Sequence, residues 1–192
     1  MQNGLYAEIM VPANETFNLY QFGGQEFNEN QAFDNGPIIL KFVNYCKRVN
    51  HNYTLFIPGG VWTMTPTDIE STIGFRMTGE SPTSGSVSSC SRLVGVVGDT
   101  VAYLLNLSGP YFDIRNLHFG TTSQPGGTGS SGGFLHLDEV AKANKSIILN
   151  GVTDSFFDGI YQTQGRTLFD ISNSHNLYFG WLNIRQSGQL TR

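Results

Sequence analysis

The hydrophobic positions near the start of the chain alternate with polar ones. Over residues 16–22, Phe17 and Leu19 share one side and a polar residue separates them. Alternation with a period of two is typical of a strand, and the Gly-Gly pair that follows ends it. A second apolar run over 53–57 predicts another strand, which resumes after a Pro-Gly-Gly turn. We expect residues 1–15 to form a lead-in to a domain that begins at residue 16.

Between these two strands the hydrophobic period changes to that of a helix over about 37–49. The apolar residues that share one face of this helix are Ile38, Phe42, Cys46 and Val49. Asp34 or Asn35 can cap its first turn, and Pro37 suits that turn because its ring fixes a helical backbone angle. We interpret Cys46, on the apolar face, as a buried small hydrophobic residue rather than a nucleophile.

After residue 70 short alternating runs replace the helical period, apart from a short helical pattern over 138–144. The runs that we interpret as strands are 74–77, 93–97, 103–107, 112–119, 134–137, 147–152, 168–171, 176–179 and 181–184. Stretches over 81–91 and 121–133 interrupt them and predict surface loops. Because both loops are too short to be interdomain linkers, we predict a single domain over 16–192.

A short pattern recurs among these strands. FDIRN ends at Asn116, FDISN ends at Asn173, and ILN, which shares part of the pattern, ends at Asn150. Asn116 and Asn150 are 34 residues apart, or 21 without the 13-residue loop, and Asn150 and Asn173 are 23 residues apart. A period of about 22 residues fits one turn of a β-solenoid, whereas the L-x-x-L-x-L frame of leucine-rich repeats is absent. We therefore expect Asn116, Asn150 and Asn173 to stack as an amide ladder at a turn of the coil.

The composition agrees with such a coil and excludes several classes of protein. Glycine accounts for 23 of the 192 residues, and 14% of residues are charged against a usual value of about 25%. With 39% hydrophobic residues the chain is too apolar for a disordered segment. Its 11 basic and 15 acidic residues give no basic surface for nucleic acid, and no apolar run reaches the ~20 residues of a membrane span. Two cysteines are too few for a disulfide framework or a Cys-rich zinc site.

The order of elements in the first third of the chain resembles a known family. FNLYQFGG at 17–24, the predicted helix, and LFIPGGVW at 55–62 are similar to the first part of pectate-lyase-like, right-handed parallel β-helix proteins, most of all to their bacteriophage tailspike branch. The resemblance implies an all-β fold, a right-handed parallel β-helix (solenoid) with an N-terminal capping helix. The chain departs from the family over 23–32, GGQEFNENQA, where members have a Gly-Asp-Gly run and an acidic pair.

Length is a second difference from that family. Members have several more coils and a C-terminal trimerising region, whereas this sequence ends soon after a predicted strand. An uncovered last coil would expose unpaired strand edges. We therefore expect the chain to be truncated at its C-terminus, or its last coil to be covered by a partner.

The resemblance also implies a function and a setting. It predicts a homotrimeric virion protein of the phage tail, in contact with other tail or baseplate proteins, with no nucleic-acid partner and no membrane insertion. In one interpretation the protein binds and depolymerises a host cell-surface polysaccharide, as a glycosidase or a lyase. In the other it is a non-catalytic structural or attachment protein of the tail. A polysaccharide lyase outside phage is a third possibility.

Two carboxyl groups flank the scissile bond in glycoside hydrolysis, so outward aspartates are the catalytic candidates. Asp113 and Asp170 each precede an inward Ile in the repeat, and we expect both to point outward from one face, two turns apart. At ~4.8 Å per turn their separation is roughly 9–10 Å, near the upper end of the ~6.5–9.5 Å of inverting enzymes. Asp158, in an aromatic-rich segment, is the third candidate. The alternative is that these aspartates are only solvated, or that Asp113 pairs with Arg115.

The remaining polar residues point to no other chemistry. The four histidines lack metal-binding spacing, and the sequence has no G-x-S-x-G nucleophile elbow and no lysine-containing phosphate loop. We therefore expect no metal and no cofactor. His118 is out of phase with its apolar neighbours Leu117 and Phe119, so we expect its side chain to be exposed.

Overall fold

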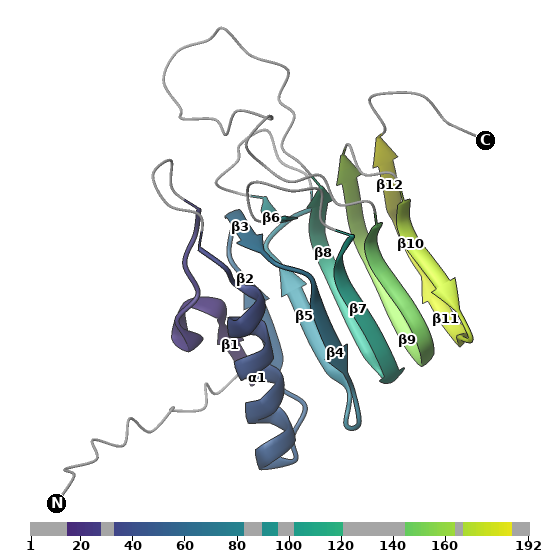
Figure 1. Ribbon diagram of the computed structural model, residues 1–192, viewed down its shortest axis with the longest axis horizontal. Coiled ribbons are helices and arrows are strands. Elements are labelled where there is room, and N and C mark those ends of the chain that lie inside the picture. Colours follow the sequence, from purple (N-terminus) through teal and green to yellow (C-terminus); the bar gives the residue numbers. More distant parts are fainter. Residues whose placement is uncertain are drawn as a thin grey trace, which may run out of the picture.

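The computed structural model describes residues 15–27, 33–82, 90–95, 102–120, 145–163 and 167–185. In this part of the chain one α-helix, α1 (Gly36–Val49), and a 3-10 turn, η1 (Leu19–Phe22), accompany a twelve-stranded sheet (Figure 1). The strands are β1 (Thr16–Asn18), β2 (Thr54–Ile57), β3 (Gly60–Met64), β4 (Thr67–Glu70), β5 (Phe75–Gly79), β6 (Ser91–Gly95), β7 (Tyr103–Pro110), β8 (Phe112–Gly120), β9 (Lys145–Thr163), β10 (Thr167–Ser172), β11 (His175–Phe179) and β12 (Leu182–Arg185). Several predicted segments lie outside the described residues: the loop 121–133, the strand 134–137, the helical turn 138–144 and residues 1–14 of the lead-in.

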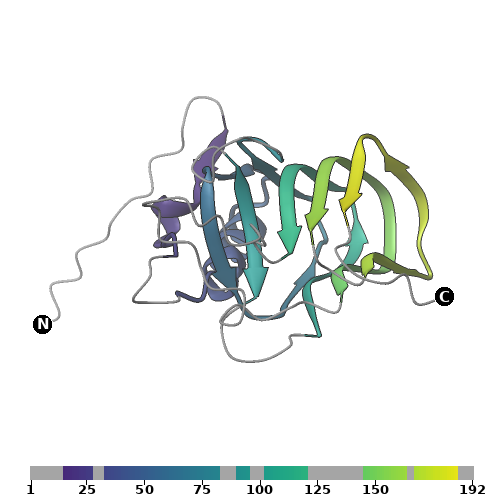
Figure 2. The same cartoon turned by 90° about the horizontal axis from the view of Figure 1, so that it is seen from above.

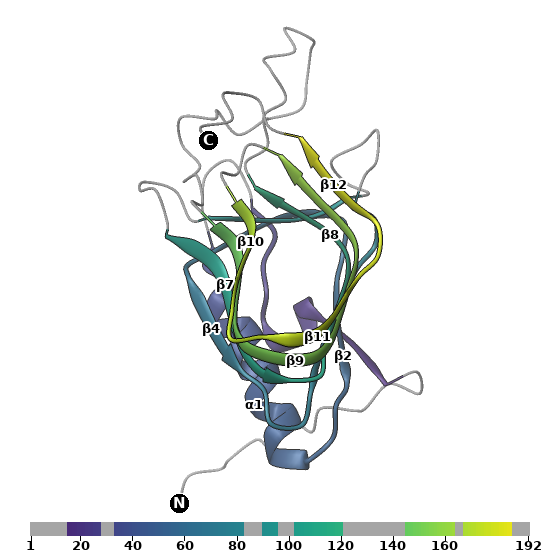
Figure 3. The ribbon, with the colours of Figure 1, turned by 90° about the vertical axis from the view of Figure 1, so that its right-hand side faces the viewer.

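The sheet curls round an apolar interior because its parallel strands pair in three separate stacks (Figure 3). The first stack contains β1, β2, β5, residues 112–115 of β8, residues 153–158 of β9, and β11. The second contains β3, β6, residues 117–120, residues 160–163, and β12. The third contains β4, β7, residues 145–149, and β10. The chain passes through the stacks in this order, and Figure 2 shows successive turns side by side, coloured from purple to yellow.

The repeat period expected from the sequence is confirmed. Partners in neighbouring turns are 22 positions apart where no insertion separates them, as in Thr54 beside Arg76 and Thr153 beside His175. The described chain is therefore mostly β, with a curled parallel sheet and one helix, as predicted.

The phase assigned to the repeat is wrong. FDIRN belongs to the first stack, where Asp113 lies beside Phe156, whereas FDISN belongs to the third stack, where Asp170 lies beside Ile148. One segment begins a turn and the other ends one, so the two cannot share a face. The local pattern is the same because inward and outward positions alternate in every stack.

The predicted amide ladder is wrong for the same reason. The register places Asn116 level with Gly159, at the corner from the first stack to the second. Asn150 lies beside Ser172, and Asn173 follows one residue later. Asn116 and Gly159 do share a left-handed backbone, with φ of 55° and 63°. A Cβ atom at Gly159 would lie 2.4 Å from Asn116 Oδ1, so this corner needs glycine.

Helix α1 lies at the end of the sheet that begins with β1 and β2 (Figure 2), one residue longer than predicted. Its buried face carries Ile38, Ile39, Phe42, Val43 and Cys46. The Phe42 ring packs 6.2 Å from both Phe17 and Phe75, measured between ring centroids. The helix thus covers the first turns of the apolar interior, and Cys46 is buried there as expected.

The start of α1 is tied to the sheet by two side chains. Asp34 Oδ1 accepts hydrogen bonds from Gly36 N at 3.0 Å and from Thr65 N at 2.8 Å. Asn35, which is fully buried, makes no capping bond to the helix. Its amide instead donates to the carbonyls of Gln25 and Thr63. Of the two predicted caps, Asp34 therefore serves the helix, and Asn35 joins the connection before the helix to strand β3.

The interior of the first stack is a column of apolar side chains at one register. Its fully buried members are Phe17, Leu55, Met77, Ile114 and Phe157. Phe179 continues the column in β11, where its ring stacks on Phe157 with a centroid distance of 5.5 Å. Phe179 is 39% exposed because no further strand of the described chain covers it.

We predict that Phe157→Ala lowers the free energy of unfolding by about 3–5 kcal/mol, since it removes a fully buried ring and leaves a cavity between two turns. Urea denaturation measures the change. Tyr178→Ala is the matched control, because the neighbouring Tyr178 side chain is 63% exposed and its loss should cost under about 0.5 kcal/mol. Equal effects of the two changes would contradict the described packing.

Candidate functional site

The outward side chains of the first stack form the candidate site, and we call this surface the outer face. In β8 the buried Phe112 and Ile114 alternate with Asp113 and Arg115, so the charged pair points outward. In the next turn Asp158 lies level with Arg115. Alternation along each strand and parallel stacking of the turns therefore bring three charged side chains together.

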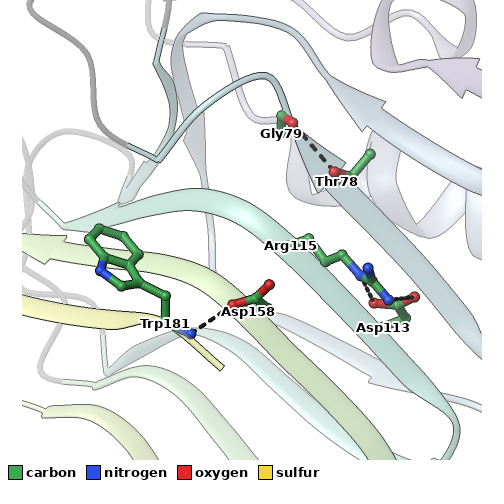
Figure 4. A network of polar contacts seen from close by, with 6 residues as sticks. All are labelled: Thr78, Gly79, Asp113, Arg115, Asp158 and Trp181. Atoms are coloured by element: carbon green, nitrogen blue, oxygen red, sulfur yellow. Dashed lines mark hydrogen bonds and ion pairs between the residues drawn. The ribbon is translucent and has the colours of Figure 1, made fainter. Parts of the chain in front are cut away.

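Asp113 and Arg115 form a bidentate ion pair (Figure 4). Arg115 Nε donates to Asp113 Oδ1 at 2.6 Å, and Nη2 donates to Oδ2 at 3.0 Å. The guanidinium carbon lies 4.6 Å from the centroid of the Phe156 ring. The hydrogen bond to Asp113 raises the pKa of Arg115 against the opposing effect of burial, and the charge of Asp158 adds to it. The interpretation that Asp113 pairs with Arg115 is confirmed.

Asp158 is held in place by the chain of the following turn. Its Oδ1 accepts a hydrogen bond from Trp181 N at 2.7 Å. A Cβ atom at Gly180 would lie 2.2 Å from the same oxygen, so a glycine is needed for the backbone to approach the carboxylate. Figure 4 shows Asp158 with Trp181 on one side and the Asp113–Arg115 pair on the other.

The two carboxylates of the outer face lie on neighbouring turns. Asp113 is level with Phe156, and Asp158 is two residues further along β9. With ~4.8 Å between turns and ~3.3 Å per residue along a strand, their Cα atoms are about 8 Å apart. Arg115 is electrostatically coupled to both. The structure thus brings Asp113 together with the third catalytic candidate rather than with the second.

Asp170 lies elsewhere, which corrects the predicted pair. It belongs to the third stack and forms an ion pair with Lys145, with Nζ and Oδ2 2.5 Å apart. Asp113 belongs to the first stack, so the two carboxylates do not share a face or a register. The prediction failed because the matching pentapeptides occupy different sides of the turn.

Two exposed aromatic rings accompany the charges on the outer face. Trp181 is 47% exposed and Tyr178 is 63% exposed. Tyr178 lies level with Phe156, in the same row as Asp113. Tyr178 is not among the predicted site residues. Its position between Leu177 and Phe179, which point inward, is nevertheless the alternation that predicts an outward side chain.

His118 is buried, which corrects the expectation that it is exposed. It does point away from the interior, beside Arg92 of the preceding turn. Cys90 covers it, however, with Sγ 3.5 Å from His118 Nδ1, and the Tyr161 ring packs edge-on with a centroid distance of 4.6 Å. Burial, and then the charge of Arg92, lowers the pKa of His118 to about 3. Alternation gave the direction of the side chain correctly, but a connection outside the sheet decided its burial.

The described part of the chain offers no obvious place for a metal ion. No group of three or more His, Cys, Asp or Glu residues within it is arranged to hold one. Among the described residues, no helix is long and apolar enough to cross a membrane.

No protein-family model and no curated protein matches this sequence. Among solved structures, the chain is similar to the crystal structure of a putative glycosyl hydrolase from Parabacteroides merdae, with a TM-score of 0.59 and 13% sequence identity. The match covers 88% of this chain and 74% of that one. At this level of identity the likeness shows a shared fold.

We predict that His118 makes the protein acid-sensitive before its carboxylates titrate. Its pKa is about 3 in the folded state and about 6.5 when unfolded, so the unfolded chain binds more protons between these values. The stabilisation is complete above pH 6.5 and is lost, by at most about 1.4 kcal/mol per pH unit, as the pH falls toward 3. Urea denaturation at pH 7.5, 6 and 5 should show a shallower loss for His118→Gln than for wild type. His175→Gln, at an exposed position, is the control and should behave as wild type.

Proposed function

We propose that this chain is a carbohydrate-processing protein that binds a polysaccharide on the outer face of the first stack and cleaves it there. The observation that carries the proposal is the arrangement of Asp113 and Asp158 on neighbouring turns, with Arg115 coupled to both and Trp181 beside Asp158. The fold shared with a putative glycosyl hydrolase supports a role in carbohydrate chemistry.

The two carboxylates suit an inverting hydrolysis. In that reaction one carboxyl group protonates the departing oxygen and the other activates a water on the opposite side of the sugar, with about 6.5–9.5 Å between them. The Cα atoms of Asp113 and Asp158 are about 8 Å apart, so two side chains that project outward in parallel place their carboxyl groups within this range. In the proposed arrangement Asp158 is the acid that donates its proton to the departing oxygen. Asp113, whose two oxygens accept hydrogen bonds from Arg115, is the base that takes a proton from the attacking water.

The exposed aromatic rings would bind the sugar itself. A pyranose ring has an apolar face that packs on an aromatic side chain and a rim of hydroxyl groups that needs polar partners. Trp181 and Tyr178 provide the apolar surfaces, and the Asp113–Arg115 pair, two turns earlier, provides charged hydrogen-bonding groups. The outer face therefore combines the two kinds of contact that a polysaccharide requires.

We further propose that the curled sheet is a right-handed parallel β-helix. Crossovers between parallel strands of one sheet are right-handed in about 98% of cases, since a right-twisted strand returns to the sheet most easily that way. The resemblance of residues 17–24 and 55–62 to the first part of this family supports the same proposal.

That resemblance also supports a setting for the protein. We propose a phage tailspike or receptor-binding protein, located in the virion tail, which contacts other tail or baseplate proteins and recognises a polysaccharide of the host cell surface. Stacked outward side chains form an extended surface that suits a polymer better than a small molecule.

A non-catalytic attachment protein is the second candidate, and one observation favours it. Both oxygens of Asp113 accept hydrogen bonds from Arg115, so this carboxylate is engaged before any ligand arrives. An arginine–carboxylate pair with exposed aromatic neighbours can hold a polysaccharide without cleaving it. Binding and cleavage must therefore be measured separately.

The catalytic assignment predicts that Asp158→Asn and Asp113→Asn each lower cleavage by about 100-fold or more, since proton transfer by one positioned carboxyl group contributes roughly 10²–10⁴-fold. A panel of bacterial capsular polysaccharides and lipopolysaccharides is incubated with the protein, and reducing ends and ultraviolet-absorbing unsaturated products are followed. Asp170→Asn is the matched control, because Asp170 is a partly exposed aspartate of the third stack. This variant should cleave the polysaccharide as wild type does.

The outcomes of this experiment separate the candidates. Loss of cleavage in both outer-face variants with retained binding supports hydrolysis at Asp113 and Asp158. Binding without cleavage by the wild type identifies the attachment protein. Near wild-type turnover by both variants contradicts the assigned carboxylate pair.

The tailspike proposal predicts a trimer. Sedimentation equilibrium of the chain at micromolar concentration should give three times the 21.1 kDa mass of one chain. A monomer over the whole concentration range would contradict the trimeric assignment and would leave the carbohydrate assignment to be decided by the cleavage experiment.

A further inference from the structure

One corner of the fold repeats in four successive turns, where the third stack leads into the first. The residues at this position are Gly74, Tyr111, Asp154 and Asn176, which follow from the pairing of Phe75 with Phe112, Pro110 with Thr153, and His175 with Thr153. All four have a left-handed backbone, with φ of 98°, 64°, 51° and 55°. We call them the corner row.

Tyr111 is the exception in the corner row. Glycine, aspartate and asparagine tolerate a left-handed backbone, whereas a bulky aromatic residue with positive φ is a genuine outlier. The corner does not need a tyrosine for its hydrogen bonds, because both are made by the backbone. Tyr111 N donates to Thr153 O at 3.0 Å, and Tyr111 O accepts from Phe75 N at 3.1 Å.

The ring of Tyr111 is not part of the core either. It is 57% exposed, whereas the next residue, Phe112, is 1% exposed. Asparagine tolerates this backbone with less strain, and Asn176 adopts it two turns later. Strained residues that the packing does not require are a sign of function, and here the function lies in the exposed ring.

The surroundings of the ring are polar and belong to the outer face. Asp154 and Asn176 are exposed, and Asn176 Nδ2 donates to Asp154 Oδ1 at 3.0 Å. Two residues after Tyr111 comes Asp113, the outward carboxylate of β8. Trp181 lies at the opposite corner, level with Gly159 and Asn116, which is five residues or about 17 Å along the strand from Tyr111.

We propose that Tyr111 is the aromatic floor of a second sugar-binding subsite, at the end of the outer face opposite Trp181. It would take a hexopyranose unit of the same polysaccharide, with the ring under the apolar face of the sugar and Asp154 and Asn176 beside its hydroxyl groups. The ligand would then run from Tyr111 at one corner to Trp181 at the other, along the strand direction and over two successive turns. This inference rests on the proposed function and extends it to an oligosaccharide that spans two aromatic subsites.

The composition of the corner row favours a sugar over a protein partner. Protein interfaces centre on clusters of apolar and aromatic side chains that exclude water. In the corner row Tyr111 is flanked by a glycine on one side and by an aspartate and an asparagine on the other. A single ring among hydrogen-bonding groups is the pattern that suits one sugar unit.

The test compares Tyr111→Asn with Tyr111→Phe. The first removes the ring and keeps a residue that tolerates the left-handed backbone, and the second keeps the ring. Tyr111→Asn should raise the folded-to-unfolded ratio in urea by about 5- to 30-fold, because it relieves backbone strain. The same variant should weaken binding of long fragments of the polysaccharide by about tenfold. Tyr111→Phe should do neither.

Binding is measured by calorimetry with the panel polysaccharide that wild type binds best, cut by partial acid hydrolysis and separated by size. Tyr111→Asn should lose affinity only for fragments long enough to reach from Trp181 to Tyr111. The shortest fragments that wild type binds should bind this variant with wild-type affinity. Trp181→Ala should weaken the binding of fragments of every length.

Three results would overturn the inference. If Tyr111→Asn binds every fragment as wild type does while Trp181→Ala binds weakly, the subsite is wrong and the proposed function stands. If wild type binds no polysaccharide of the panel, the proposed function fails and the subsite with it. If Tyr111→Asn changes only self-association in sedimentation, the ring belongs to an interface between chains.

Discussion

Parallel hydrogen bonding of each turn to the next is the constraint on which this structure depends. Within a stack it holds one register from turn to turn, so an inward residue lies over another inward residue. The buried column from Phe17 through Leu55, Met77 and Ile114 to Phe157 is the direct result. Such a column needs apolar side chains of any shape that fits the pleat, and it leaves few positions for charge, which agrees with a chain that is 14% charged.

The same register builds the outer face. Arg115 and Asp158 are 43 positions apart in the chain and become neighbours because β8 and β9 pair along the first stack. The chain has few charges, and it places two carboxylates and a guanidinium on one small area flanked by exposed aromatic rings. Corners contribute as well, since left-handed residues and glycines let the backbone approach Asp158 at Gly180 and Asn116 at Gly159. Rigid strands position the charges, and the corners set where the rings emerge.

Two of the buried polar residues of the described chain, Asn35 and His118, illustrate a different kind of control. Asn35 satisfies backbone groups of the chain before α1 and of the strand after it, and in this way fixes the helix against the sheet. His118 is held neutral beneath Cys90 and beside Arg92. In both cases a residue outside the sheet, Gln25 or Cys90, supplies a partner or the cover, so the local sequence pattern by itself says nothing about the burial.

The sequence by itself determined the helix, the alternation of the strands and the 22-residue period, because these depend on residues close together in the chain. It also indicated that Asp113 could pair with Arg115, two positions away on one strand face. Only the tertiary structure decided that Asp113 meets Asp158 and not Asp170, that Asn116, Asn150 and Asn173 do not stack, and that His118 is covered. The physical reason is that insertions of unequal length separate the strands, so the phase of each turn is settled by hydrogen bonds between turns that no local pattern encodes.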